Sequence, residues 1–261
     1  AGSVAREARE LAVGMVEENR RLLDVAEEVE SFIIRKGARP AFPINISLND
    51  IAAHYTPKTD DRLRFSNGDV VKVDVGAHVD GYIGDTAATV EVGTRNWENL
   101  IDSASQALRM VLETIGEGIK ANDLGRVIER SIKGSGYLPV VNLTGHGMKQ
   151  YNLHAGVTIP NYDDGTMTRI EKGMTLAIEP FATNGVGQVG NDKAGNIYRV
   201  MRERELRDQK ALEFFRKIRE DFGTLPFAER WCYKIDRGSN GYLRTLVRHG
   251  LIFSYPILRE I

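Results

Sequence analysis

The chain has 261 residues, of which 42% are hydrophobic and 27% are charged, and its formal net charge is −1. We expect no specific nucleic acid and no membrane as partners, because acids and bases balance and no apolar run is long enough to cross a bilayer. The single cysteine, Cys232, excludes an intramolecular disulfide and fits a reducing, cytoplasmic location.

The first part of the chain, from Ser3 to about Gly37, is expected to form two helices. Asp24 followed by Glu27 resembles a capping box at the start of the second helix, and Gly37 is a natural stop. The proline-containing segment that follows is expected to be irregular. It leads through a short turn or helix to His54.

The run from Val70 to Ala87 predicts a β-hairpin. Valines alternate with polar residues or glycine, and Asp80-Gly81 is a strong signal for a two-residue turn. With the turn there, residue 74 faces 87 and residue 85 faces 76, so Asp74 and Asp85 become diagonal neighbours on one sheet face. Two such carboxylates repel unless a cation lies between them. The hairpin is therefore a candidate metal site, with two ordinary surface aspartates as the alternative.

Two further helices and three strand segments follow the hairpin. Apolar spacing predicts a helix from Trp97 to Ile115, and Asn122 is expected to cap another helix that ends near Lys133. Strands are expected around residues 142–146, 155–159 and 174–182. Helices followed by strands thus occur twice, and this pseudo-repeat favours an α+β fold in which helices lie outside a curved antiparallel sheet.

Two later motifs add candidate metal ligands. Thr144-Gly145-His146-Gly147 places an imidazole between glycines, where the backbone can approach a ligand closely. The apolar strand that ends at Glu179-Pro180 adds a carboxylate. Together with Asp74 and Asp85, these residues form a hard oxygen and imidazole set, which suits Mn, Co, Fe or Zn in a hydrolytic dinuclear centre.

These motifs resemble those of the methionine aminopeptidases, in particular the type II branch of eukaryotes and archaea. The segment from Phe42 to Pro57 resembles the entry segment of that family, including its substrate histidine at His54. The aspartate hairpin, the Gly-His-Gly motif, His154 and the Glu-Pro pair follow in the order and spacing of the family. The resemblance runs from about Glu7 to the C-terminus and implies the pita-bread fold.

The resemblance also implies a role for each site residue. It implies that Asp74 chelates a first metal, that Asp85 bridges two metals, and that His146 and Glu179 hold the second. The metals would activate a shared water and polarise the scissile carbonyl, and Glu179 would also shuttle a proton. The two further histidines, His54 and His154, would contact the substrate. Phe42 would form part of the methionine pocket, although core packing explains this residue about as well.

The implied function is removal of the initiator methionine from nascent proteins whose second residue is small. The implied partners are the N-termini of nascent polypeptides and the ribosome, and we expect a monomer. One alternative is a non-catalytic relative that keeps the fold to bind RNA or protein. Another is a proline-specific peptidase of the same fold, which the early position of Asp74 disfavours because little room remains for a preceding domain.

The last part of the chain departs from the family pattern. We expect residues 1–203 to form the pita-bread domain, residues 204–254 a winged-helix-like insertion typical of type II, and residues 255–261 the start of the return. The family has a fifth ligand, a glutamate on a later strand, and Glu260 lies too close to Tyr255-Pro256 to take that role. We therefore expect a chain that is incomplete at both termini, that holds only one of the two family metals well and that hydrolyses poorly.

Overall fold

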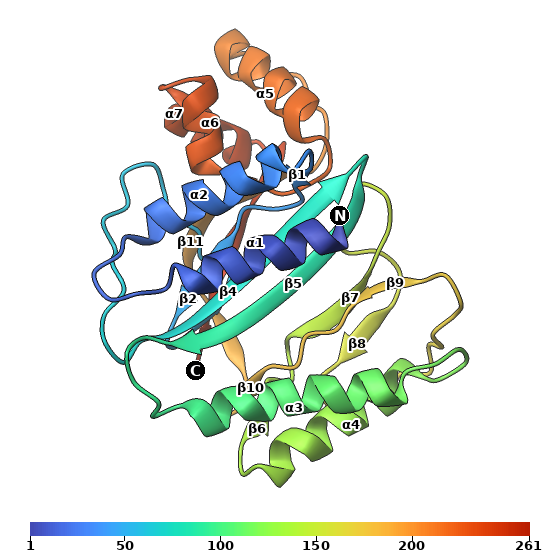
Figure 1. The fold of residues 1–261 in the computed structure, drawn as a ribbon. Helices are drawn as coiled ribbons and strands as arrows, with labels where there is room; N and C mark the ends of the chain where they lie inside the picture. Colours follow the sequence, from blue (N-terminus) through green and yellow to red (C-terminus); the bar gives the residue numbers. More distant parts are fainter.

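The hairpin of β4 (Val70–Val79) and β5 (Tyr82–Glu91) lies near the middle of the computed structural model, which describes residues 1–261 (Figure 1). On the side away from β5, strand β4 pairs antiparallel with β1 (Arg39–Pro40) and β2 (Asn45–Leu48). The predicted register is confirmed, with Asp74 opposite Ala87 and Gly76 opposite Asp85. The turn is also confirmed, because Asp80 and Gly81 have φ angles of 50° and 81°, the signs that a type I′ turn requires.

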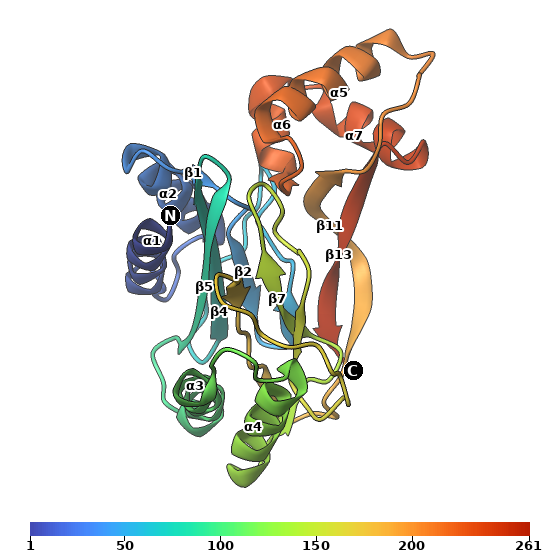
Figure 2. The same ribbon diagram turned by 90° about the vertical axis from the view of Figure 1, so that its right-hand side faces the viewer.

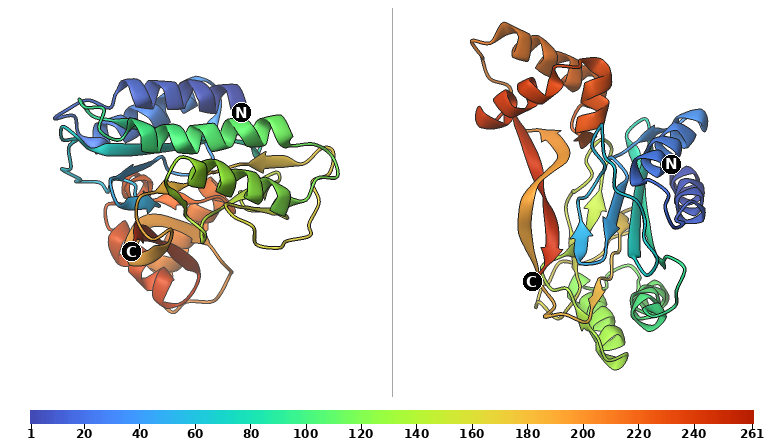
Figure 3. Two further views of the ribbon diagram at one scale, coloured as in Figure 1. Left: turned by 90° about the horizontal axis from the view of Figure 1, so that it is seen from below. Right: turned by 90° about the vertical axis from the view of Figure 1, so that its left-hand side faces the viewer.

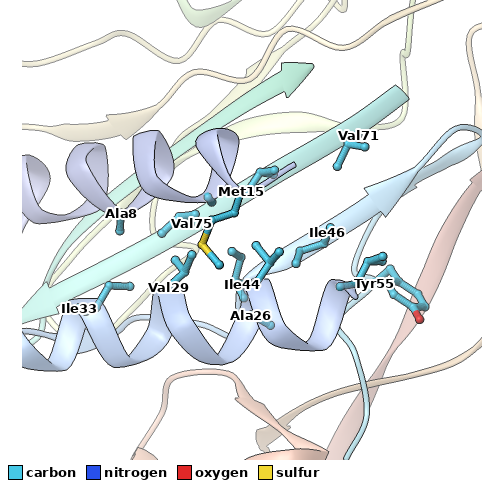
Figure 4. Packing of buried hydrophobic residues seen from close by; sticks show 14 of the residues in the cluster. Ala8, Met15, Ala26, Val29, Ile33, Ile44, Ile46, Tyr55, Val71 and Val75 are labelled. Atoms are coloured by element: carbon cyan, nitrogen blue, oxygen red, sulfur yellow. The ribbon is translucent and has the colours of Figure 1, made fainter. Parts of the chain in front are cut away.

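Helices α1 (Gly2–Gly14) and α2 (Leu22–Arg35) cover one face of this hairpin (Figure 2). The alternation of β4 turns its valines toward the helices, and the other face of the strand carries Asp74. Figure 4 shows the resulting core, in which Val71 and Val75 lie close to residues of both helices and of β2. Each fully buried aliphatic side chain contributes about 1.5–3 kcal/mol to folding.

The predicted capping box at the start of α2 is wrong. The helix begins at Leu22, Arg21 occupies the cap position, and no side chain caps the helix. Asp24 instead forms an ion pair with Arg21, at 2.5 Å between Oδ1 and Nη2. The carboxylate therefore neutralises a neighbouring guanidinium rather than accepting hydrogen bonds from the free N–H groups of the first turn.

Two further helices, α3 (Glu98–Thr114) and α4 (Ala121–Gly134), pack against each other, and α4 also packs against one edge of a three-stranded sheet. In that sheet β7 (Thr144–Met148) lies between β8 (Thr158–Pro160) and β9 (Thr175–Ala177), and β6 (Leu138–Pro139) pairs separately with β10 (Ala182–Thr183). The expected cap of α4 is wrong, because Asn122 lies inside the helix. Its Oδ1 accepts a hydrogen bond from the backbone N–H of Gly165.

The remaining sheet contains the long strands β11 (Val189–Val200) and β13 (Ile252–Glu260), flanked by β12 (Phe227–Ala228) and β3 (Ile51–Ala53). Seen from the side, β11 and β13 lie across β7 from the β4–β5 hairpin, and α1 and α2 lie outside that hairpin (Figure 2). All strand pairs are antiparallel. The chain is therefore an α+β fold in which helices surround curled antiparallel strands, as the sequence predicts.

Three helices lie between β11 and β13 in the sequence: α5 (Gln209–Phe222), α6 (Glu229–Ile235) and α7 (Ser239–Arg248). They extend beyond one end of the two strands, away from α3 and α4 (Figure 3). Together with β12 and the start of β13 they form a separate hydrophobic cluster. No helix in the structure is both long and apolar enough to span a membrane.

Candidate metal centre

Asp85, His146 and Glu179 come together from three separate parts of the chain. Asp85 lies on β5, His146 on β7, and Glu179 two residues beyond β9. The Nε2 atom of His146 lies 3.1 Å from Oε1 of Glu179 and 3.6 Å from Oδ2 of Asp85. One donor atom from each of the three residues lies within 4.8 Å of the other two, which makes this group a candidate metal site.

The glycines beside His146 allow neighbouring backbone to pack against β7. A Cβ atom on Gly145 would lie 2.3 Å from the carbonyl oxygen of Ala177, and one on Gly147 would lie 2.1 Å from that of Ala155. The atoms that require glycine at these two positions are backbone atoms of the protein itself. The backbone that packs here belongs to β9 and to the loop before β8, and the Ala177 contact holds the strand that leads to Glu179 against His146.

The two hairpin aspartates are carboxyls with a strong tendency to hold a proton. Burial and the neighbouring charge of Glu179 raise the pKa of Asp85 to about 7, although His146 acts in the opposite direction. Burial and the charges of Asp85 and Glu179 raise the pKa of Asp74 well above its usual range. Asp74 thus lies within electrostatic reach of the group, but outside the set of three whose donor atoms gather most closely.

This donor set fits a divalent metal ion. Burial lowers the pKa of His146, but the hydrogen bond and charge of Glu179 and the charge of Asp85 outweigh it, and the net shift is upward. Asp85 and His146 have side chains that are each only 9% exposed, so water screens their charges poorly. A cation between these groups would relieve the repulsion among the carboxylates. Two carboxylates and one imidazole correspond to an open, three-ligand catalytic metal site.

His154 lies directly beside the donor group. Its ring centroid is 4.3 Å from that of His146, and the two rings are tilted by 53°. His154 is exposed over part of its surface, but desolvation and the positive charges of His146, His54 and Arg199 lower its pKa to about 4. Its imidazole is therefore neutral at pH 7.

His54 follows β3 in a left-handed backbone conformation, with φ of 64°. This conformation is uncommon for a residue with a side chain and occurs most often at functional sites. Nδ1 of His54 lies 3.2 Å from the carbonyl oxygen of Pro256, and its ring centroid lies 5.3 Å from that of Tyr255. Burial lowers its pKa, and the charge of Glu179 acts against this shift, so His54 lies within electrostatic reach of the donor group.

Phe42 is buried next to the donor group in a small apolar cluster. It packs with Met148, which follows the His146 motif on β7, and with Leu225, which precedes β12. The cluster also includes Ala177, two residues before Glu179. Through Met148 and Ala177, this apolar wall is connected to the strands that carry His146 and lead to Glu179.

Two residues near the site were missed by sequence reasoning. Tyr255 packs against His54, and Arg199 places its guanidinium over the Tyr255 ring, 6.0 Å from the centroid. In the sequence, Tyr255-Pro256 resembles a motif of the family but gives no sign of a contact with His54. Arg199 had no local signal, because a charged residue near the end of a strand is ordinary in any sequence.

Comparisons with known proteins agree with this geometry. The model of metallopeptidase family M24 matches residues 1–211 of the chain. A methionine aminopeptidase of Methanocaldococcus jannaschii is 44% identical over 260 residues, which is 100% of this chain and 88% of that protein. The crystal structure of a methionine aminopeptidase from Rickettsia prowazekii has a TM-score of 0.68 and 28% identity, covering 74% of this chain and 81% of that one.

One further solved structure is similar in fold over the whole chain. It is that of a thermophilic Arx1, with a TM-score of 0.86, covering 100% of this chain and 82% of that chain. Only 15% of the residues are identical, so this similarity concerns the fold alone. Together with the peptidase structures, it confirms the predicted pita-bread arrangement.

Proposed function

The chain belongs to metallopeptidase family M24, and we infer from this membership and from the gathered donors that it is a methionine aminopeptidase. The observation that carries this conclusion is the meeting of Asp85, His146 and Glu179 within 4.8 Å in a chain whose full length aligns with such enzymes. The reaction is hydrolysis of the peptide bond that follows an N-terminal methionine.

We propose that Asp85, His146 and Glu179 bind a divalent ion tightly, and that Asp74 together with Asp85, only two protein ligands, holds a second ion weakly. Mn, Co, Fe and Zn are the candidates, since oxygen and imidazole ligands suit all four. A divalent metal bound here lowers the pKa of water and polarises a carbonyl group. Glu179 is 32% exposed and also touches His146, so it is suited to transfer a proton between solvent and the leaving amine.

The two histidines near the donors have distinct proposed roles in binding the substrate. His154 is neutral at pH 7, so it can donate one hydrogen bond to a substrate carbonyl without repelling a bound cation. His54 is proposed to commit the proton on Nδ1 to the carbonyl of Pro256. Its Nε2 atom is then an acceptor, which suits an N–H group of the substrate backbone.

The apolar wall around Phe42 suits a methionine side chain. We propose that the thioether packs against Phe42, Met148 and Leu225, because sulfur and aromatic rings attract each other and a buried apolar chain leaves water. The proposed preference for a small second residue is supported by the similarity of the whole chain to methionine aminopeptidases.

The substrates are then the N-termini of newly made polypeptides. An exopeptidase must reach an N-terminus before folding buries it, so we propose that the protein acts as a monomer in the cytoplasm at or near the ribosome. Co-sedimentation with translating ribosomes and light scattering after size-exclusion chromatography test these two points.

The competing function, a non-catalytic module that binds RNA or protein, has no observation that favours it. One assay distinguishes the peptidase from the binding module: it measures the methionine released from a Met-Ala-Ser peptide after metal is added. Metal-dependent release supports the peptidase. A protein that binds metal and never releases methionine would instead support the binding module.

A further inference from the structure

We propose that Arg199, with Phe253 and Tyr255, forms a subsite for a carboxylate in the part of the substrate that follows the scissile bond. The ligand is an acidic side chain of the peptide, at its third or fourth residue. This inference rests on the proposed aminopeptidase function and adds a determinant of substrate selection to it.

The three side chains form one continuous surface on β11 and β13. Arg199 is the direct register partner of Phe253 across the two strands. Its guanidinium lies 5.8 Å from the centroid of Phe253 and 6.0 Å from that of Tyr255, within the range of cation–π attraction. The two rings lie edge to face with centroids 5.3 Å apart. The aromatic pair thus supports the guanidinium in one position.

This surface begins at the proposed catalytic residues and leads toward solvent. Tyr255 packs on His54 with ring centroids 5.3 Å apart, and Phe253 packs on Tyr255 at the same spacing. Along this line the side chains change from half-buried His54 and Tyr255 to Phe253, which is 41% exposed, and to exposed Arg199. A peptide held at its N-terminus by the buried donors must leave toward solvent, and this line offers such a route.

The spacing of the rings sets the position of the acidic residue. An extended peptide advances about 3.3 Å per residue. The two ring-to-ring steps from His54 to Phe253 therefore correspond to about three residues. If His54 contacts the first peptide units, the side chain of residue three or four reaches Arg199.

The charge of Arg199 is available to a ligand. Other arginines have carboxylate partners, such as Arg219 with Glu203 and Arg259 with Asp50 and Asp192. Arg199 has no ion pair and donates no side-chain hydrogen bond within the protein. Stacking on the rings occupies a face of the guanidinium and leaves N–H donors at its edge, where a carboxylate is bound in bidentate fashion. Its positive charge also reaches His154, whose pKa it helps to lower.

The test compares amidated peptides that differ only in one isosteric pair. The metal-loaded protein is assayed on Met-Ala-Ser-Glu and Met-Ala-Ser-Gln peptides, and on a second pair with the Glu or Gln at position three, all with a blocked C-terminus so that the side chain is the only carboxylate. We expect kcat/KM to be about 3-fold to 10-fold higher for the Glu peptide in one of the two pairs, as for a charge-assisted hydrogen bond at an exposed site.

Two variants assign this preference to the proposed subsite. Arg199→Ala is expected to bring the ratio of kcat/KM for the Glu peptide to kcat/KM for the Gln peptide to about one. Arg202→Ala, a matched change of a nearby exposed arginine outside the aromatic pair, is expected to keep it. Equal rates for Glu and Gln in the unaltered protein, or a preference that survives Arg199→Ala, would overturn the inference while leaving the aminopeptidase intact. Absence of methionine release from every peptide would instead refute the proposed function, and this inference with it.

Discussion

Nε2 of His146 lies 3.1 Å from Oε1 of Glu179, although the two residues belong to different segments of the chain. His146 is on β7, and Glu179 follows the strand paired with it, so the antiparallel register of β7 and β9 brings the imidazole and the carboxylate together. Asp85 reaches the same point from the aspartate hairpin. The proposed chemistry depends on this convergence, and the predictions below test its consequences.

Replacing His146 with alanine is expected to weaken binding of Mn²⁺ or Co²⁺ by at least about 100-fold. Loss of a residue that only supports a metal ligand typically lowers affinity 10-fold to 100-fold, and His146 is proposed as a ligand itself. Isothermal titration calorimetry of the metal-free protein measures this change. His249→Ala is the control, because His249 is exposed at the end of α7. Equal affinities for the two variants would exclude His146 from the metal site.

The metal-free protein is expected to lose stability as the pH rises. The pKa of Asp85 is raised to about 7 in the folded chain, whereas an unfolded aspartate has a pKa of about 3.9. The folded state therefore holds this proton more tightly, and its stability contribution falls as the pH increases from about 4 to about 7. Asp74 adds to the decline in the same direction, because its pKa is also raised.

Thermal unfolding from about pH 5 to about pH 8 measures this decline. Asp85→Asn, which cannot ionise, is expected to flatten the Tm profile, and added metal is expected to raise Tm more at about pH 8 than at about pH 5. A Tm profile of the metal-free protein that is identical with and without Asp85→Asn would contradict the assigned burial of this carboxyl.

Gly147→Ala is expected to destabilise the protein by about 1–3 kcal/mol, the usual range for forcing extra volume into a packed region. The added Cβ would lie 2.1 Å from the backbone oxygen of Ala155, and backbone cannot move aside cheaply. Gly116→Ala is the matched control, because nothing lies within 4 Å of its Cβ position. Urea unfolding of both variants measures the difference, and similar midpoints would show that the loop before β8 yields easily.

Arg230→Met is expected to destabilise the protein by about 3–5 kcal/mol, because it leaves Glu30 as an unpaired buried charge. Arg230 forms a fully buried ion pair with Glu30 of α2 and donates to Thr56 Oγ1 and to the carbonyl of Pro57. It thereby joins α6 to the segment that follows His54. Chemical unfolding measures the loss.

The matched double variant, Arg230→Met with Glu30→Gln, is expected to be less destabilised than the sum of the two single changes. Removing both charges together leaves neither of them alone in the interior. Strict additivity of the two single effects would mean that the buried pair does not couple α6 to α2.

His154→Ala is expected to lower kcat for methionine release by about 100-fold or more, the usual size of a lost hydrogen-bonding or acid–base contact in a reaction. Its ring contacts His146 but is not proposed as a ligand, so metal affinity should stay within a few-fold of the original. Steady-state kinetics and calorimetry on the same preparation separate the two effects. Loss of metal binding in this variant would reassign His154 to the metal site.

The aspartate hairpin could be predicted from the sequence because its signals are local. Alternating valines set the faces of the strand, and Asp80-Gly81 set the turn. The register that places Asp74 and Asp85 as diagonal neighbours could therefore be predicted without tertiary information. The two predicted helix caps failed for the opposite reason. Asp24 and Asn122 have the chemistry of caps, but Arg21, three residues before Asp24, pairs with the first. Gly165, 43 positions from Asn122, donates to the second, and no local pattern reveals that partner.

The convergence of β7 and β9 was only partly accessible from the sequence. His146 and Glu179 stood out as residue types, but their spacing depends on sheet pairing across a long connection. The need for glycine at positions 145 and 147 arises from backbone that approaches from β9 and from the loop before β8. The aromatic line from His54 to Phe253 joins residues about two hundred positions apart, and a single sequence has no signal for such a contact.

The most direct test of the whole account is release of free methionine from an amidated Met-Ala-Ser peptide by the protein, before and after Mn²⁺ or Co²⁺ is added, with His146→Ala measured beside it. We expect no release without metal, slow but measurable release with it, and a loss of most of that activity in the variant. Binding of metal without release of methionine, or equal release by His146→Ala, would contradict the assignment of this site as an aminopeptidase centre.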